Sequence, residues 1–143
     1  IFEARYMDMA KACLKDNSPF GVCLIREGRE VGAPAVPAAV GTLARIERWD
    51  MAQLGVLEIV ALGEKRFRIL ERRVEPDGLA RARVELLAPE ADATAPGSLS
   101  YCADLALRFA LPLGLQQELL ELDDAPTRVA RLNALLKSIR EAP

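Results

Sequence analysis

The chain has 143 residues, of which 51% are hydrophobic and 28% charged, a composition typical of a globular domain and not of a disordered or fibrous chain. Nineteen Lys and Arg residues against 21 Asp and Glu residues give a formal net charge of −2, which argues against a general polyanion binder. The chain has no histidine, and this excludes Ser/His/Asp and Cys/His catalysis and His-ligated metal sites.

The first element is a helix. Apolar residues recur at steps of three and four from Phe2 through Met9 to Leu14, which predicts a helix that runs to about Lys15. Pro19 ends it, because the residue before a proline is pushed out of the helical region. Residues 20–26 are predicted to form a short strand, and residues 32–39, with two prolines and no period, an irregular surface loop.

Four strands are predicted next, over residues 40–49, 54–62, 65–73 and 79–87, and their short separations indicate consecutive antiparallel pairing. In the last two strands Phe67 and Ile69 alternate with Arg66 and Arg68, so we expect one buried face and one wet face. Residues 76–78, with the sequence Pro-Asp-Gly, predict the turn of a hairpin.

The pattern changes to a helical period after residue 90. Residues 91–98 are rich in Ala, Asp, Pro, Gly and Ser and are predicted to be a linker between a β-rich part, residues 1–90, and a small helical bundle, residues 99–143. Three helices are expected there, over residues 99–109, over residues 115–122, and from a cap at Asp123 or Asp124 onward. The predicted class is therefore α+β.

Several chemistries are excluded or disfavoured. No Gly-Lys dipeptide occurs, which excludes a phosphate-binding P-loop. Cys13, Cys23 and Cys102 lie at apolar positions, where cysteine behaves as a small hydrophobe, and no two of them form a Cys-x-x-Cys pair. We expect no catalytic residue, no metal and no cofactor, and a reduced, cytoplasmic setting. No stretch reaches the ~18 apolar residues of a membrane helix, so no membrane partner is expected.

One cluster of charged residues is a candidate binding surface. Arg66, Arg68, Arg81 and Arg83 are predicted to share the wet side of the hairpin. Cross-strand ion pairing explains such a cluster, and the alternative is a recognition face for acidic partners or for a phosphate backbone. The single tryptophan is interpreted as a lid over the core or as an interface anchor. The candidate partner-binding residues are Trp49, Arg66, Arg68, Arg81 and Arg83.

Several segments in order resemble the N-terminal, substrate-recognition domain of Lon proteases, also called the ATP-dependent protease La domain, and its stand-alone bacterial forms. They are residues 1–6 (Ile-Phe-Glu-Ala-Arg-Tyr), 20–22 (Phe-Gly-Val), 41–46 (Gly-Thr-Leu-Ala-Arg-Ile), 63–69 (Gly-Glu-Lys-Arg-Phe-Arg-Ile) and 119–122 (Leu-Leu-Glu-Leu). The resemblance implies a PUA-like, twisted antiparallel β pseudo-barrel with one helix, followed by a helical bundle. Members of this family normally begin with a strand ahead of the Ile-Phe-Glu segment, so we expect the chain to be abridged.

The resemblance implies a non-catalytic domain that binds unfolded or flexible polypeptide segments. Two alternatives from other classes remain. One is a nucleic-acid-binding module that uses the arginine-rich hairpin, which the lack of interleaved aromatic residues disfavours. The other is an assembly domain whose helices associate into a homo-oligomer.

Overall fold

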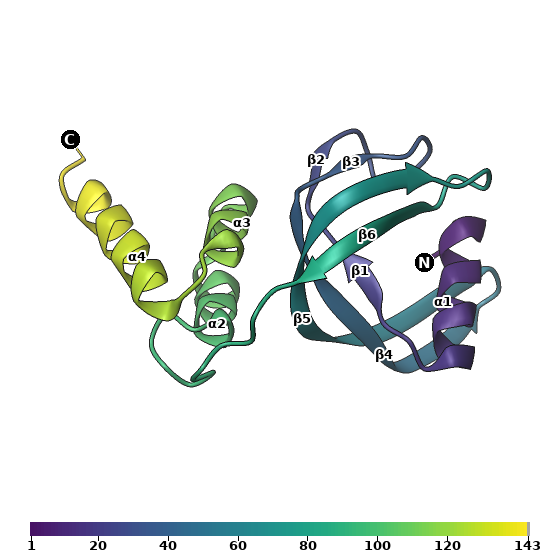
Figure 1. Ribbon diagram of the computed structural model, residues 1–143, viewed down its shortest axis with the longest axis horizontal. Helices are drawn as coiled ribbons and strands as arrows, with labels where there is room; N and C mark the ends of the chain where they lie inside the picture. The colour runs from purple at the N-terminus through teal and green to yellow at the C-terminus, as the bar shows by residue number, and fades with distance from the viewer. Residues whose placement is uncertain (143) are drawn as a thin grey trace. The chain divides into compact units, whose positions relative to one another are not determined.

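The chain folds into two units, Ile1–Ala88 and Pro89–Pro143, which are described separately (Figure 1). The structure is a computed structural model and describes residues 1–142. The first unit contains one helix and all the strands, and the second contains three helices. The boundary falls ahead of the segment predicted to be a linker, residues 91–98, which lies within the second unit.

Helix α1, Ala4–Asp16, packs with Ala10 and Cys13 buried. It ends at Asn17, which adopts a left-handed conformation with φ of 49°, a position that asparagine tolerates better than most residues. The predicted helix is thus confirmed, with its start two residues later than expected.

A four-stranded antiparallel sheet follows, in the order β1-β4-β5-β6. Its strands are β1 (Phe20–Val22), β4 (Val40–Gln53), β5 (Val56–Val74) and β6 (Ala80–Leu86). Register shifts interrupt both the β4–β5 and the β5–β6 pairing, and such bulges bend a sheet, as the curved strands of Figure 1 show. Among residues 1–142, β1 and β6 remain edge strands, so the sheet forms no closed barrel.

Two strand predictions were wrong. Residues 54–62 and 65–73 form one strand, because Gly63 stays in the ladder opposite Ala44 and makes no turn. Residues 20–26 form two strands, since β1 pairs with β4 whereas β2 (Ile25–Glu27) pairs with β3 (Val36–Pro37). Strand β3 comes from the segment expected to be an irregular loop, where the Ala38 N–H donates to the Leu24 carbonyl at 2.7 Å.

The predicted turn between β5 and β6 is confirmed. The Glu75 N–H donates to the Leu79 carbonyl, and the Gly78 N–H to the Glu75 carbonyl, each at 2.8 Å. The Asp77 carboxylate accepts from the Leu79 N–H at 2.9 Å. Gly78 has φ of +86°, which only glycine adopts without strain. Asp77 and Gly78 thus have the roles expected of their types.

The centre of the sheet is a phenylalanine ring stacked on glycine backbone. Phe67 is 3% exposed and lies directly opposite Gly41 across the β4–β5 ladder. A Cβ atom at Gly41 would come within 2.7 Å of the Phe67 ring and 2.5 Å of the Val22 carbonyl oxygen. One at Gly21 would come within 3.0 Å of the same ring. Both glycines therefore let β1 and β4 approach the ring closely.

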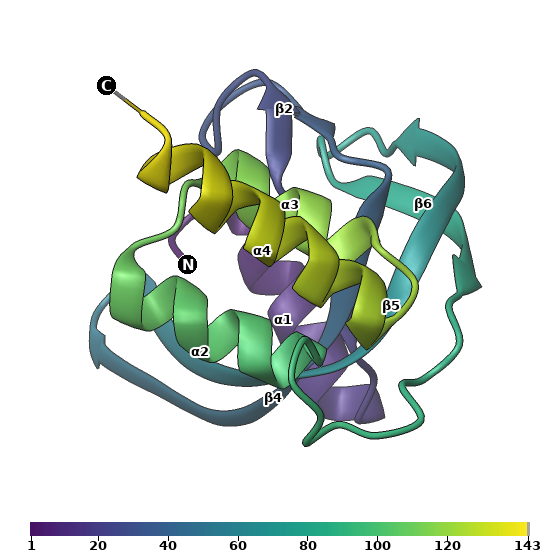
Figure 2. The ribbon, with the colours of Figure 1, turned by 90° about the vertical axis from the view of Figure 1, so that its left-hand side faces the viewer.

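The second unit consists of α2 (Leu99–Phe109), α3 (Leu113–Glu121) and α4 (Ala125–Arg140), which Figure 2 shows from the front. Side chains cap two of the helices: Ser98 accepts from the Tyr101 N–H, and Asp124 from the Thr127 N–H. Of the two predicted caps, Asp124 is thus the one used. The apolar core of the unit is formed by Cys102, Leu115, Leu119 and the half-buried Leu111, Leu122, Leu132 and Leu135.

A fully buried guanidinium joins the pieces of this unit. Arg128 is 0% exposed and donates to the carbonyls of Leu119 at 3.0 Å, Leu122 at 2.7 Å and Gly97 at 3.2 Å. It also pairs with the Glu90 carboxylate, whose two oxygens in turn accept from the Leu99 N–H at 3.0 Å. The segment ahead of α2 is therefore bonded to α3 and α4.

We expect Gly41→Ala to lower the free energy of unfolding by about 1 to 3 kcal/mol, the usual cost of overpacking a filled core. The clash is with backbone and a buried ring, neither of which can move aside. Gly63→Ala is the control, because its Cβ would lie an ordinary 3.4 Å from Thr42, and we expect a change within about 1 kcal/mol. Urea denaturation measures both. Equal effects of the two substitutions would contradict this account of the sheet.

We expect Arg128→Met to destabilise the second unit by about 3 to 5 kcal/mol, because it leaves the carboxylate of Glu90, only 13% exposed, and several carbonyls without their donor. The matched control is Arg131→Met on the same helix. The Arg131 side chain is 39% exposed and pairs with the half-exposed Glu118 at 2.7 Å, so its loss costs at most about 1 kcal/mol. Helix content followed by circular dichroism during denaturation distinguishes the two.

Candidate functional site

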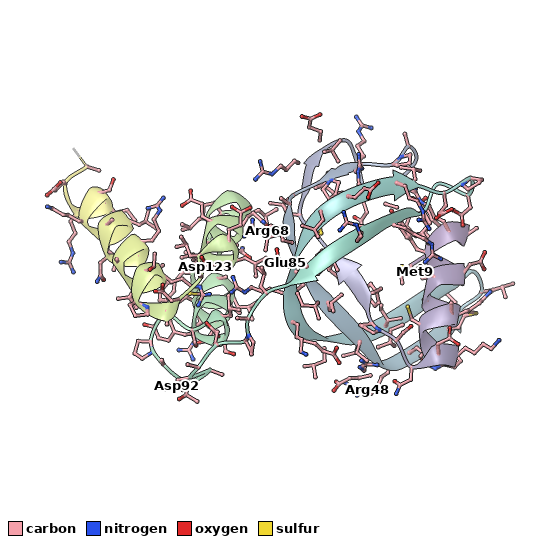
Figure 3. All side chains as sticks on the ribbon, viewed as in Figure 1. Met9, Arg48, Arg68, Glu85, Asp92 and Asp123 are labelled. Carbon is pink, nitrogen blue, oxygen red and sulfur yellow. The ribbon has the colours of Figure 1, made fainter. Side chains whose placement is uncertain are left out.

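The first unit carries a cleft of about 700 Å³ between α1 and the end of the β5–β6 hairpin nearest the turn. Met9, Ala12, Cys13 and Asp16 of α1 form one side, and Figure 3 shows Met9 on the side of α1 turned toward the strands. The connection after α1 and the start of β1 contribute residues 18–21, and the hairpin contributes residues 71–73 and 79–83. Both edge strands of the sheet therefore reach the cleft.

The cleft has an apolar base. Leu79 is 7% exposed and Cys13 is 9% exposed, while Met9 and Phe20 are half-buried. These side chains come from α1, from β1 and from the residue before β6. An apolar base with polar groups around it is the usual arrangement of a binding pocket.

Four arginines and two carboxylates, Asp16 and Glu71, supply the charge that lines the cleft. Arg73 and Arg81 are direct cross-strand neighbours and share one carboxylate, Glu75, at 2.7 and 3.6 Å. Arg83 lies 3.6 Å from the Glu71 carboxylate. The arginines that line the cleft are Arg72, Arg73, Arg81 and Arg83.

A buried arginine ties the two walls together. Arg5, in the first turn of α1, is 6% exposed and donates from Nη1 to the Gly78 carbonyl at 2.9 Å. Its Nε lies 2.9 Å from the Glu3 carboxylate, and its guanidinium lies 4.7 Å from the centre of the Tyr6 ring. The helix is thus anchored to the turn that leads into β6.

Two cysteines outside the cleft, Cys23 and Cys102, are poorly suited to act as nucleophiles. All three cysteines are free. Burial raises the pKa of the Cys23 thiol, and it does so for Cys102 as well, where the nearby Arg128 charge opposes the effect. A raised pKa leaves less of the reactive thiolate. Within residues 1–142 no three His, Cys, Asp or Glu side chains are grouped to hold a metal ion.

Comparisons with known proteins agree with this architecture. The model of the ATP-dependent protease La (LON) substrate-binding domain matches residues 1–109. The chain belongs to this family. It is also similar to the crystal structure of a Lon N-terminal domain protein from Xanthomonas campestris, with 32% identity, a TM-score of 0.74, and coverage of 94% of this chain and 85% of that one. A comparison with curated proteins found no match.

The match confirms the expected Lon N-terminal family and the α+β class. Membership of this family also gives the chain a general, non-catalytic role in substrate recognition. None of the helices in the described part of this LON domain is long and apolar enough to cross a membrane.

The five candidate residues of this LON domain do not lie together. Arg81 and Arg83 line the cleft. Arg68 is exposed but pairs across the ladder with Glu85, and Figure 3 places both away from Met9, toward the other end of the hairpin. Trp49 is 58% exposed near the far end of β4, so its interpretation as a lid over the core is wrong.

The exposed position expected for Arg66 is also wrong, since Arg66 is 6% exposed. A register shift in the ladder between Thr42 and Ala44, close to Arg66, breaks the simple alternation of faces. The sequence interpretation also missed the wall that α1 contributes to the cleft of the LON domain. Met9 and Cys13 belong to the apolar face that the helical periodicity of α1 predicts. The periodicity does not show whether such a face packs against strands or lines a cleft.

We expect Arg5→Met to lower the free energy of unfolding of the LON domain by about 1 to 3 kcal/mol, since it removes a buried, charged hydrogen bond. Lys11→Met on the same helix is the control. The Lys11 side chain is 65% exposed and lies 3.9 Å from Asp8, an arrangement that contributes little. Urea denaturation of both variants checks the anchoring role, and a smaller effect of Arg5→Met than of Lys11→Met would contradict it.

Proposed function

We propose that this LON domain binds flexible polypeptide segments in the cleft between α1 and the β5–β6 hairpin. The observation that carries the proposal is the cleft itself, about 700 Å³ with an apolar base, a charged rim and two strand edges, in a member of a substrate-binding family. Flexible chains offer apolar side chains and unpaired backbone groups together, whereas the backbone groups of a folded protein are mostly paired.

Binding of this kind is weak for each segment. Ordering a flexible chain costs free energy that offsets much of the contact energy. A domain that captures many different segments benefits from this, because a captured segment is released again. Exposed arginine pairs around the rim also adapt to different partners at little cost, since such pairs contribute little to stability.

The test is fluorescence anisotropy with the full chain and a labelled model protein, prepared both native and as its reduced, carboxymethylated, unfolded form. We expect the unfolded form to bind at least about tenfold more tightly, corresponding to roughly 1.4 kcal/mol. Ala12→Trp, which places a large side chain at the cleft, should weaken this binding by a similar factor.

Ala4→Trp is the matched control, because Ala4 is exposed on the same helix and does not line the cleft. Its binding should equal that of the unsubstituted chain. No binding of the unfolded form, or equal loss in the two variants, counts against the proposal.

An assembly role is the second candidate, and the second unit supports it. Leu107, Phe109 and Leu113 are 86%, 70% and 64% exposed around the α2–α3 connection, and exposed apolar side chains that lie close in the chain are typical of interaction sites. Sedimentation over a range of concentrations distinguishes this role: a chain that stays monomeric throughout would exclude it.

A further inference from the structure

We propose that α2 joins two copies of this chain by packing antiparallel against its own counterpart, with Asp104 of each copy paired to Arg108 of the other. This rests on the assembly role considered above, names a second copy of the chain as the partner and specifies the geometry of the contact. It is independent of polypeptide binding in the cleft.

One side of α2 faces away from the core of its unit. Cys102 is 6% exposed and belongs to that core, and Figure 2 shows α3 and α4 above α2. Residues three and four positions apart share a face of a helix, so Asp104, Leu107 and Arg108 lie together on the side of α2 away from Cys102. The Asp104 and Arg108 side chains are 56% and 70% exposed.

Leu107 gives this face an apolar centre. Of the large apolar side chains described in the second unit, Leu107 is the most exposed, at 86%. Tyr101 is 43% exposed and lies one helical turn before Asp104. An apolar centre bordered by charged side chains is the arrangement typical of an interface between proteins.

The order of the charges favours a second copy as the partner. Asp104 and Arg108 form an ion pair within one chain, at 2.9 Å, and an exposed pair of this kind contributes little and exchanges partners readily. The carboxylate precedes the guanidinium along the chain, so an antiparallel copy of α2 presents the same two charges in the opposite order. Each carboxylate then meets a guanidinium, whereas a parallel copy would bring like charges together.

The spacing of these residues fits a two-fold axis. An axis level with Ala106 places Asp104 of each copy level with Arg108 of the other, because the two residues lie equally far from it along the helix. Leu107 is only about 1.5 Å along the helix from that level, so the two Leu107 side chains meet beside the axis. One contact thus buries Leu107 and forms both ion pairs, as the self-complementary surface of a two-fold dimer requires.

Other partners match this face less well. An uncharged apolar helix would cover Leu107 but would take the Asp104–Arg108 pair out of water with no new charged partner, which costs free energy. A segment with charges of one sign would attract one of the two side chains and repel the other. A second copy supplies both charges at the required spacing.

The first experiment is sedimentation velocity of the full chain at concentrations from about 1 μM to about 1 mM. An interface formed by one helix is small, and small interfaces are weak, so the upper part of this range is needed. We expect the sedimenting mass to rise from that of one chain to that of two.

Charge exchange gives the sharper test. Asp104→Arg leaves two guanidinium groups on the face, and Arg108→Asp leaves two carboxylates. Each variant alone should dimerise at least about tenfold more weakly, because like charges then meet across the axis. An equimolar mixture of the two variants should recover the dimer, because opposite charges meet on both sides of the axis. The chain that carries both substitutions should dimerise as well, since its face is again self-complementary.

Two further variants test the centre of the face and the control surface. Leu107→Ser should weaken dimerisation at least about tenfold, since it removes the apolar centre. Arg131→Asp is the matched control, because it also removes an exposed ion pair of the second unit, that with Glu118, but on α4. It should leave dimerisation unchanged. Circular dichroism checks that each variant is folded, and if a single charge variant unfolds, Leu107→Ser and the doubly substituted chain decide the question.

The outcomes separate this inference from the proposed functions. Dimerisation that neither charge variant weakens, or that the mixture does not recover, overturns the antiparallel α2 contact even though the chain associates, and the assembly role then belongs to another surface. A chain that stays monomeric over the whole range overturns both the contact and the assembly role. Binding of unfolded polypeptide in the cleft is tested separately, by Ala12→Trp.

Discussion

The packing of the Phe67 ring on bare glycine backbone is the constraint on which the first unit depends. Gly41 lies under the ring in the adjacent strand, and Gly21 brings β1 to the same ring from the far side of β4. A side chain at Gly41 would push apart strands that are now in contact, and one at Gly21 would crowd the Phe67 ring. Because β1 is only three residues long, this approach and its short ladder to β4 determine where β1 lies, and hence where the first edge of the sheet is.

The other edge, β6, is positioned from outside the sheet. Its turn is bonded to α1 through Arg5 and the Gly78 carbonyl, so a hydrogen bond from the helix holds the turn that leads into β6. An exposed strand edge invites unwanted pairing between molecules, and charged side chains along the edge are one of the usual protections. Arg81 and Arg83 are charged side chains of this kind on β6.

Local signals in the sequence predicted local structure well. The Pro-Asp-Gly turn, the Asp124 cap and the span of α2 are as expected, because each depends on residues within a few positions of one another. The failures involve long-range contacts. Whether Gly63 turns or continues depends on its partner Ala44 in another strand, and no property of the Gly-Glu pair itself reveals this. The exposure of Trp49 and the burial of Arg66 likewise depend on how far β4 and β5 extend and where their ladder shifts register.

Local signals in the sequence predicted one side of the candidate site, and long-range contacts determine the other. The sequence places Arg81 and Arg83 on one side of a hairpin, which periodicity suffices to show. It does not show that α1 closes the other side, because that requires the tertiary contact made by Arg5.

Some arginines of this chain are buried and others are exposed along the cleft. The net charge of the chain therefore does not describe the local charge at the cleft. Arg5 and Arg128 are buried and donate to backbone carbonyls, which fix their positions and remove their charge from the surface. The arginines along the cleft remain exposed. The residues that line the cleft include more guanidinium groups than carboxylates. An overall charge of −2 therefore coexists with a locally positive strand edge. Since screening limits the reach of exposed charges to about 10 Å in ordinary salt, a charged group at the cleft would experience the local charge of the cleft and not the total charge of the chain.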